Sequence, residues 1–204
     1  MIPTSIDAHP ERNVIRLQLR KNSVLREMTE TDRHRLEPHL EIVDCHKGDA
    51  LLHQGVHEME QYFVLEGMLK RVVTNADGKE MILRFADAGD METSYAAWRL
   101  NTPTPYGIVC VTKARVAKLA MPTWVAFMDE HPKFKLAFEY QVMQLMSEIL
   151  AHTITLHLLD APGRVHRFER KHPELAELIP KKELAAYLNL SAETLSRLKQ
   201  QGKI

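Results

Sequence analysis

The side chains with the clearest chemistry stand near the end of the sequence, in the segment KKELAAYLNLSAETLSRLKQQ (residues 181–201). Glu193 and Arg197 are four residues apart, with Ser196 between them, at positions that a helix would turn outward. A glutamate accepts a hydrogen bond from the amino group of cytosine, and an arginine donates a pair of bonds to guanine. Such side chains near the start of a helix indicate that it reads base edges in the major groove of DNA.

The residues around these side chains have the pattern of a helix-turn-helix, in which two helices touch at apolar positions and cross at a small residue. Ala185 takes the crossing position. Asn189 takes the turn position, because asparagine adopts left-handed backbone more readily than most residues, and Ser191 caps the second helix. The apolar positions at the contact are Leu184, Leu188, Leu190, Leu195 and Leu198. The alternative is an ordinary αα-hairpin in which Glu193 and Arg197 form only a surface ion pair.

The charge distribution favours a polyanion as the partner of this end of the chain. The whole sequence has 27 basic and 27 acidic residues, so its net charge alone favours neither nucleic acid nor membrane. Residues 161–204, however, contain nine Lys and Arg against five Glu. Phosphate contacts by such cations would make DNA affinity fall with salt. The predicted DNA-contacting residues are Lys181, Lys182, Ser191, Glu193, Thr194, Ser196, Arg197 and Lys199.

A long helix is predicted over residues 135–160, which contain neither Pro nor Gly. Apolar residues recur there at steps of four and three, the spacing that aligns side chains along one seam of a helix. The predicted dimer seam consists of Phe138, Val142, Leu145, Ile149, His152, Leu156 and Leu159. A second apolar line contains Tyr140, Met143, Met146 and Leu150. We expect one face to pack on its own domain and the other to pair with a second copy.

His152 is the polar member of the predicted seam, and the sequence allows two interpretations of it. The imidazole is either a satisfied polar group that faces its twin, or a pH sensor. The second interpretation follows because two imidazolium ions brought together lower each other's affinity for protons.

The part of the chain from residue 40 to 119 has the pattern of an antiparallel β-roll of the jelly-roll type. Short apolar runs are separated there by turns rich in Gly and Asp, and Asp77-Gly78 marks a hairpin. The predicted strands contain residues 50–52, 62–65, 69–73, 81–85, 108–111 and 116–120. Residues 1–22 are expected to form a loose arm with one helical turn, and Thr29–His39 a short helix start.

These elements together predict an α+β fold with three parts. The first is an N-terminal β-roll over residues 1–134. The second is a dimerisation helix over residues 135–160, and the third is a helix-turn-helix domain over residues 161–204. We expect the helix-turn-helix to bind DNA and the long helix to link it to the roll.

Several other function classes find no support in the sequence. No Ser/His/Asp set, phosphate loop or carboxylate pair appears, so we expect no enzyme, and no cofactor or metal either. Cys45 and Cys110 match no metal spacing and are expected to be buried free thiols in a reducing compartment. No targeting segment or long apolar stretch is present, so we expect a cytoplasmic protein with no membrane partner. A metal-dependent cupin that uses His53, His57 and Glu60 is an alternative, although its two histidines are four residues apart rather than two.

Five segments together carry a resemblance to a known family. They are KGDALLHQG (47–55), YFVLEGMLKRV (62–72), DGKEMILRFADAGD (77–90), DAPGRV (160–165) and LSAETLSRL (190–198). From about Leu25 to its last residue the sequence resembles the Crp/Fnr family of bacterial transcription regulators. The resemblance implies a cyclic-nucleotide-binding-type β-roll, a homodimer and a winged helix-turn-helix that reads a palindromic site in double-stranded DNA. RNA polymerase and an unknown small-molecule effector are further implied partners.

The resemblance is close at the recognition helix and departs elsewhere. Glu193, Ser196 and Arg197 match the Fnr-like pattern residue for residue, whereas the N-terminal cysteine cluster of iron–sulfur members is missing. The sequence ends at Ile204, shortly after this helix, so we expect a short or missing β-wing.

The second departure concerns the effector pocket. Cyclic-nucleotide binders need an arginine for the buried phosphate, and none stands around residues 104–107. The pocket residues implied by the resemblance are Arg84, Glu92, Thr93, Ser94, Tyr95 and Arg99. We expect no binding of cyclic AMP. A cyclic-nucleotide sensor with a vestigial DNA-binding tail is the alternative.

Overall fold

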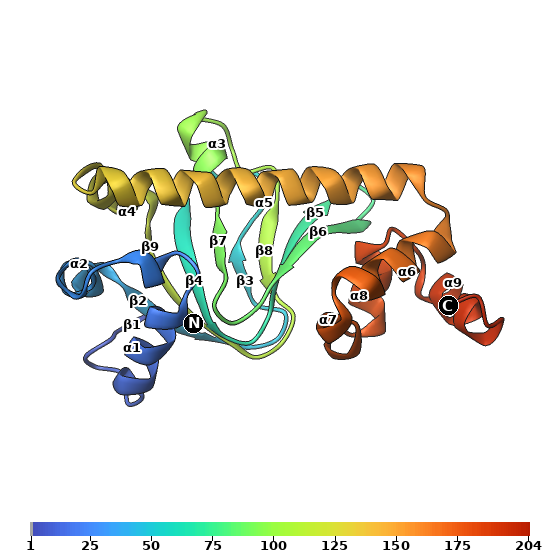
Figure 1. The fold of residues 1–204 in the computed structure, drawn as a ribbon, viewed down its shortest axis with the longest axis horizontal. Coiled ribbons are helices and arrows are strands. Elements are labelled where there is room, and N and C mark those ends of the chain that lie inside the picture. Colours follow the sequence, from blue (N-terminus) through green and yellow to red (C-terminus); the bar gives the residue numbers. More distant parts are fainter. Residues whose placement is uncertain (1) are drawn as a thin grey trace. The chain divides into compact units, whose positions relative to one another are not determined.

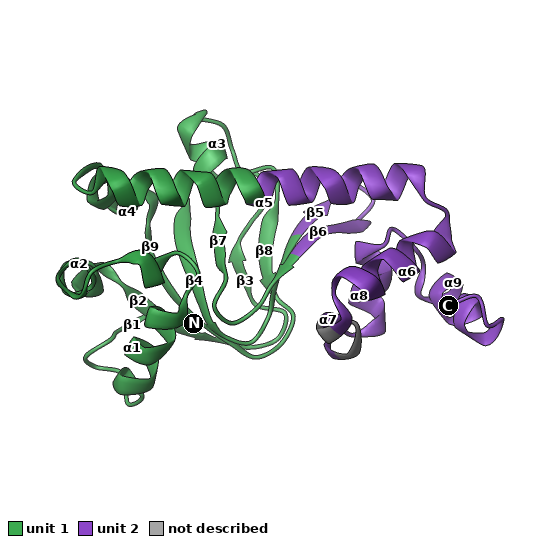
Figure 2. Cartoon of the chain, viewed as in Figure 1, with its two compact units in different colours: residues 1–71, 85–144 green, residues 72–84, 145–204 purple. Residues whose placement is uncertain are grey.

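The chain divides into two compact units, which Figure 2 shows in separate colours. The computed structural model describes residues 2–204, apart from the side chains of residues 174, 176 and 177. The first unit contains Met1–Arg71 and Phe85–Gln144, and the second contains Val72–Arg84 and Leu145–Ile204.

The N-terminal segment of the first unit is more ordered than the sequence predicts. Strand β1 (Thr4–Ser5) is followed by α1 (Arg12–Lys21), in which Ile15 and Leu19 are buried. The expectation of a loose arm with one helical turn was therefore wrong. These two apolar side chains lie one turn apart, and their burial stabilises a helix of ten residues.

Short helices connect this segment to the sheets. They are η1 (Leu25–Glu27), α2 (Glu30–Leu36) and η2 (Glu37–His39). The helix start predicted within residues 29–39 is confirmed, because the Thr29 side chain accepts a hydrogen bond from the Asp32 N–H at the beginning of α2.

Two antiparallel sheets make up the roll, as predicted (Figure 1). One sheet has the strand order β1-β2-β9-β4-β7, and the other has the order β3-β8-β5-β6. Five of the six predicted runs lie within a strand, and the sixth (108–111) extends one residue past the end of β8, whereas β2 and β7 were not predicted as separate strands. The strands are β2 (Glu41–Cys45), β3 (Ala50–Leu52), β4 (Glu60–Glu66), β5 (Leu69–Thr74), β6 (Glu80–Ala86), β7 (Met91–Thr93), β8 (Gly107–Cys110) and β9 (Ala114–Ala120).

The turn between β5 and β6 confirms the predicted hairpin. Gly78 has a φ of 78°, a conformation that glycine adopts at no steric cost, and its N–H donates to the Asn75 carbonyl at 3.0 Å. The Asn75 side chain accepts hydrogen bonds from the backbone N–H groups of Asp77 and Lys79, at 3.1 and 2.8 Å. Local turn chemistry therefore sets the pairing of these two strands.

An aromatic cluster fixes the first half of the long helix on the roll. Helix α3 (Tyr95–Arg99) and helix α4 (Met121–Asp129) lead to α5 (Pro132–Leu158), which has the predicted length to within a few residues. Trp124 of α4 is fully buried. Its ring lies edge-on to Phe63 of β4 at 5.4 Å and to Phe138 of α5 at 5.3 Å. Sheet, α4 and the start of α5 thus share one core.

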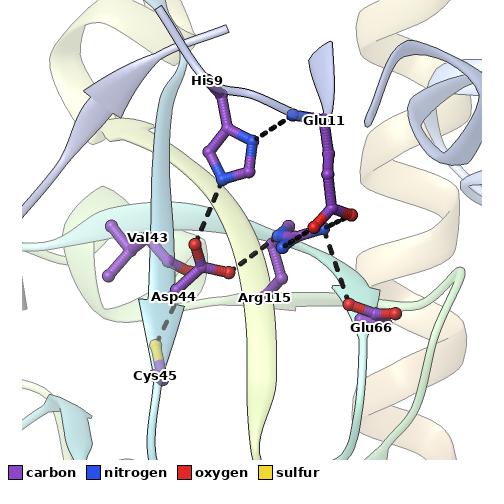
Figure 3. Close-up of polar contacts among 7 residues, drawn as sticks. All are labelled: His9, Glu11, Val43, Asp44, Cys45, Glu66 and Arg115. Atoms are coloured by element: carbon purple, nitrogen blue, oxygen red, sulfur yellow. Dashed lines mark hydrogen bonds and ion pairs between the residues drawn. The ribbon is translucent and has the colours of Figure 1, made fainter. Parts of the chain in front are cut away.

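A network of charges holds the N-terminal segment on the sheet (Figure 3). Arg115 of β9 donates from Nε to Asp44 at 2.7 Å and from Nη1 to Glu11 at 2.8 Å. His9 lies 3.1 Å from the other Asp44 oxygen, and the Arg115 guanidinium lowers the pKa of the Glu11 carboxyl. Three segments far apart in sequence are therefore joined by one guanidinium.

The second unit contains four further helices, drawn in orange and red in Figure 1. They are α6 (Ala161–Lys171), α7 (Pro173–Leu178), α8 (Lys181–Tyr187) and α9 (Ala192–Gln200). Helix α6 begins at Ala161. Asp160 caps it by accepting from the Gly163 N–H, and Pro162 is tolerated in the first turn. Within the described residues, no helix combines the length and apolarity that a membrane crossing requires.

Candidate functional site

Helices α8 and α9 form the helix-turn-helix that the sequence predicts. Asn189 has a φ of 52°, and the Leu190 N–H donates to the Ala185 carbonyl at 2.8 Å, which closes the turn. Ala185 is buried at the crossing. Ser191 caps α9, because its hydroxyl accepts from the Thr194 N–H at 3.0 Å. Of the five leucines predicted at the contact, Leu188, Leu195 and Leu198 are buried, whereas Leu184 and Leu190 are half-buried.

The predicted DNA-contacting residues lie on the solvent side of this motif. Thr194 is the exception, since it is half-buried and its hydroxyl accepts a hydrogen bond from Ser191. The exposed members are Lys181, Lys182, Ser191, Glu193, Ser196, Arg197 and Lys199. Ser191 has its hydroxyl engaged in the cap. An outward Glu193 in the first turn of α9 and an outward Arg197 in its last turn fit base reading, and the exposed lysines around them fit phosphate contacts.

The predicted dimer seam on α5 needs correction. Four of its seven residues are buried within a single chain, so they offer no surface to a second copy. These four are Phe138, Val142, Leu145 and Leu156. Phe138 belongs to the aromatic core, where its ring also lies edge-on to Tyr95 at 5.3 Å. The steps of four and three residues do align these side chains along one face of the helix, but that face is turned toward the interior of the chain. The half-buried members are Ile149, His152 and Leu159.

The exposed apolar line of α5 shares Tyr140, Met143 and Leu150 with the second predicted line and extends it in both directions. Leu136, Tyr140, Met143, Leu150 and Ile154 have exposed fractions of 70, 57, 61, 60 and 48%. Their steps are four, three, seven and four residues, and the exposed Ser147 stands at the missing position of the repeat. Such a line suits a coiled-coil seam with a second helix. Met146 and Leu158 flank it and are exposed too.

His152 is not exposed on that line but packs within the second unit. Its ring stacks on the Tyr187 ring at 3.8 Å, and its Nε2 lies 3.0 Å from the Tyr187 carbonyl oxygen. Burial lowers the pKa of His152 to about 4, against the opposing effect of this hydrogen bond. Of the two interpretations, the structure favours a satisfied polar residue, although its partner is Tyr187 and not a second histidine.

The interior of the roll contains a charged pair that the sequence did not single out. Arg71 of β5 donates from Nε and Nη2 to the Glu92 carboxylate of β7, at 2.9 and 2.6 Å, and neither side chain has any exposed surface. The guanidinium also lies 4.2 Å from the centre of the Tyr106 ring. Burial by itself lowers the pKa of Arg71. The negative charge of Glu92 more than offsets this effect, so the pKa of Arg71 is raised and the guanidinium stays protonated.

Two buried polar atoms near this pair lack a hydrogen-bond partner in the described structure. They are Nη1 of Arg71 and the hydroxyl oxygen of Ser94. Orphaned groups of this kind are rare in protein interiors, because each costs the free energy of its lost hydration. The interior of the roll therefore contains polar groups beside its apolar core. The sequence did contain a signal for a buried Arg71. Arg71 stands two residues after Leu69 in the same strand, so both side chains point to the same face of the sheet.

The structure gathers some of the predicted effector-pocket residues and separates others. Glu92, Thr93 and Ser94 are buried in and beside β7, and the Tyr106 hydroxyl donates to the Thr93 carbonyl at 2.8 Å. Tyr95 is buried too, and its hydroxyl donates to Glu139 of α5 at 2.6 Å, which with burial raises its pKa to about 12.

The two arginines predicted for the pocket, Arg84 and Arg99, are not buried as these residues are. Arg99 is exposed, and its guanidinium lies 5.9 Å from the centre of the Tyr95 ring. Arg84 is half-buried in β6 and belongs to the second unit. The buried arginine of the roll is thus Arg71, and not either of these two.

The residues of the cupin alternative do not form a metal site. Glu60 pairs with Lys118 at 2.6 Å and accepts a hydrogen bond from the Tyr62 hydroxyl, whereas His53 and His57 are exposed. Across the described residues, no three His, Cys, Asp or Glu side chains gather closely enough to hold an ion. Cys45 and Cys110 are free and buried, as expected.

Comparison with known proteins agrees with this geometry. Residues 42–131 match the family model of the cyclic nucleotide-binding domain. The chain is 21% identical over 159 residues to the cAMP-activated global transcriptional regulator CRP of Salmonella typhimurium, which covers 73% of this chain and 76% of that protein. Such relatives are transcription regulators and not enzymes.

Solved structures share the fold of both parts of the chain. The c-di-GMP responsive global regulator CLP of Xanthomonas campestris has a TM-score of 0.71 at 15% identity, with 85% of this chain and 92% of that chain covered. FixK2 of Bradyrhizobium japonicum has a TM-score of 0.68 at 17% identity, with 80% and 86% covered.

Proposed function

We propose that this chain, a member of the Crp/Fnr family of transcription regulators, binds a palindromic site in double-stranded DNA as a homodimer. The observation that carries the proposal is the capped helix α9, which turns Glu193, Ser196 and Arg197 to solvent. Two such helices would enter successive major grooves about 34 Å apart. Arg197 would contact guanine, and Glu193 would contact cytosine.

The test of sequence-specific DNA binding distinguishes contacts with base edges from contacts with phosphates. Bound fragments are first selected from genomic DNA, and fluorescence anisotropy then measures affinity for a selected site and for random DNA. Arg197→Ala should weaken specific binding about tenfold or more while random binding changes little. Arg170→Ala is the matched control, because Arg170 is exposed on α6 and outside the predicted DNA-contacting residues. An equal loss on both DNAs would mean that Arg197 touches only phosphate.

The proposed dimer would pair two α5 helices through the exposed line that contains Tyr140, Met143 and Leu150. Water-exposed apolar side chains at heptad spacing gain free energy when a second helix covers them. The position of Ser147 in the middle of the line lets the two backbones approach closely. Phe138, Val142 and Leu145, which are buried within the single chain, would hold the opposite side of the helix in place.

We further propose that the roll does not bind cyclic AMP. A cyclic phosphate requires a positive charge, and the charge of the buried Arg71 is already neutralised by Glu92. Displacement of Glu92 would separate two buried opposite charges, which is costly. Thermal unfolding with and without millimolar cyclic AMP tests this. A clear rise of the melting temperature with the nucleotide would favour the alternative of a cyclic-nucleotide sensor.

A further inference from the structure

Cys45 and Cys110 meet where the two sheets of the roll come together. Cys45 is the last residue of β2 and Cys110 is the last residue of β8, and these strands belong to different sheets. Both residues are buried, with exposed fractions of 1 and 2%. Their side chains share a hydrogen bond between the two thiols. The first unit therefore contains a pair of neighbouring free thiols, each from one sheet.

The backbone keeps the two cysteines close to each other. The turn that follows Cys45 is hydrogen-bonded to the main chain of Cys110. The Gly48 N–H donates to the Cys110 carbonyl at 2.8 Å, and the Cys110 N–H donates to the Asp49 carbonyl at 2.9 Å. Two cysteines form a disulfide only where their backbones are already near each other. This pair meets that condition through its main-chain contacts, and not through the side chains alone.

The two thiols are not equivalent. The hydrogen bond with the Cys110 thiol lowers the pKa of the Cys45 thiol. Burial and the charges of Asp49 and Asp44 oppose this effect without cancelling it. The same hydrogen bond, together with burial, raises the pKa of Cys110. Because the thiolate is the nucleophile, Cys45 is the sulfur that reacts first, and Cys110 keeps its proton.

The thiol pair lies next to an exposed turn. His46, Lys47 and Gly48, which directly follow Cys45, are exposed, and the His46 side chain has an exposed fraction of 89%. Segments with exposed backbone open locally at a lower free energy than strands in a core. A small oxidant therefore needs only a local opening of this turn to reach Cys45.

We propose that Cys45 and Cys110 are a reversible dithiol site, which a peroxide oxidises to a disulfide that joins the two sheets. The Cys45 thiolate attacks one oxygen of hydrogen peroxide, the O–O bond breaks, and a sulfenic acid forms while hydroxide leaves. The Cys110 sulfur then attacks the Cys45 sulfur, the S–O bond breaks, and water leaves with the Cys110 proton. The hydroxide takes up the proton that Cys45 released. Two thiols and one peroxide thus give one disulfide and two waters.

Peptide mapping of the full chain tests the site without DNA. The folded protein is treated with millimolar hydrogen peroxide, and the remaining thiols are alkylated after denaturation. Mass spectrometry of proteolytic peptides should then find Cys45 and Cys110 joined within one chain. Both thiols should be lost together, and dithiothreitol should restore both by thiol–disulfide exchange. Because this map requires no variant, it decides the proposal even where a substitution unfolds the roll.

Two variants test the assigned order of reaction. In Cys110→Ala the second step is blocked, so dimedone should label the sulfenic acid of Cys45. Cys45→Ala is the matched control, which keeps only the thiol with the raised pKa. Its labelling should be at least about tenfold slower, because a smaller fraction of Cys110 is thiolate. Melting temperatures check that both variants are folded.

Three results would overturn the proposal. The first is a Cys45 that stays reduced in peroxide, or that gains only sulfinic acid with no disulfide. The second is a disulfide that joins two chains, which non-reducing gel electrophoresis separates from a bond within one chain. The third is equal dimedone labelling of the two variants, which would remove the assigned order. Because no DNA is present, failure here leaves the proposed DNA reading untouched.

Discussion

His152 of α5 and Tyr187 of α8 stack face to face, with ring centres 3.8 Å apart and planes tilted by 7°. The imidazole Nε2 also lies 3.0 Å from the Tyr187 carbonyl oxygen. A neutral imidazole with its proton on Nε2 donates this hydrogen bond. The last turns of the long helix are therefore attached to the first helix of the helix-turn-helix by a stack and a hydrogen bond.

This contact should make stability depend on pH. The pKa of His152 is lowered to about 4, below its ordinary value of 6.5, so the unfolded chain binds the proton more readily. The contribution is fully present above pH 6.5 and is lost as the pH falls toward 4. His152→Phe keeps a ring on Tyr187 without titrating, so its free energy of unfolding should fall less over this range.

Urea unfolding between pH 4.5 and 7 measures the difference between wild type and His152→Phe. At pH 7 the variant should lose only the hydrogen bond, worth about 1 kcal/mol. His46→Gln is the control, because the His46 side chain is 89% exposed. A variant with the same pH slope as wild type would mean that His152 does not titrate in this range.

The buried pair of Arg71 and Glu92 should be costly to break and cheap to replace. Arg71→Met removes the guanidinium that pairs with the buried Glu92 carboxylate, so the free energy of unfolding should fall by about 3–5 kcal/mol. Arg71→Met with Glu92→Leu removes both charges, and its loss should be smaller than the single loss. Urea denaturation of the wild type, the two single variants and the double variant measures the free energy of coupling between the two side chains. Additive losses would contradict a direct interaction.

The exposed line of α5 should control dimer formation. Met143→Glu and Leu150→Glu place a charge where a second helix would bury an apolar side chain, a difference of about 1.5 kcal/mol or more. Each should weaken dimerisation at least about tenfold in sedimentation equilibrium. Leu100→Glu is the matched control, since Leu100 is 73% exposed and lies outside α5. Dimers unaffected by both substitutions would place the interface elsewhere.

The turn of the helix-turn-helix should tolerate glycine and reject a branched residue. Asn189 has a φ of 52°, where β-branched side chains clash with the backbone. Asn189→Val should destabilise the chain by about 1–2 kcal/mol, whereas Asn189→Gly should change little. Asn13→Val, on the exposed side of α1, is the control. Thermal unfolding checks all three, and equal stability of the two Asn189 variants would remove the steric argument.

Local patterns in the sequence were sufficient for much of the fold. The strand runs, the Asp77-Gly78 hairpin, the Ser191 cap and the Asn189 turn depend on residues a few positions apart, and each was predicted. The outward direction of Glu193, Ser196 and Arg197 could be predicted from the periodicity of the helix alone. Its contact with DNA stays a prediction, because periodicity reports which side faces solvent and not what binds there.

Only the tertiary structure decided which apolar line of α5 is inward. Both lines have helical spacing, so nothing local separates them. Trp124 and Tyr95 enclose Phe138, and this contact turns Tyr140 and Met143 outward.

The same limit applies to the pairs that join distant segments. Arg71 meets Glu92 across 21 residues, and His152 meets Tyr187 across 35. Such pairs depend on how strands and helices pack, and packing free energy is shared among many side chains at once. The sequence therefore determined the elements and their outward chemistry, whereas the packing of the whole chain selected the buried faces and partners.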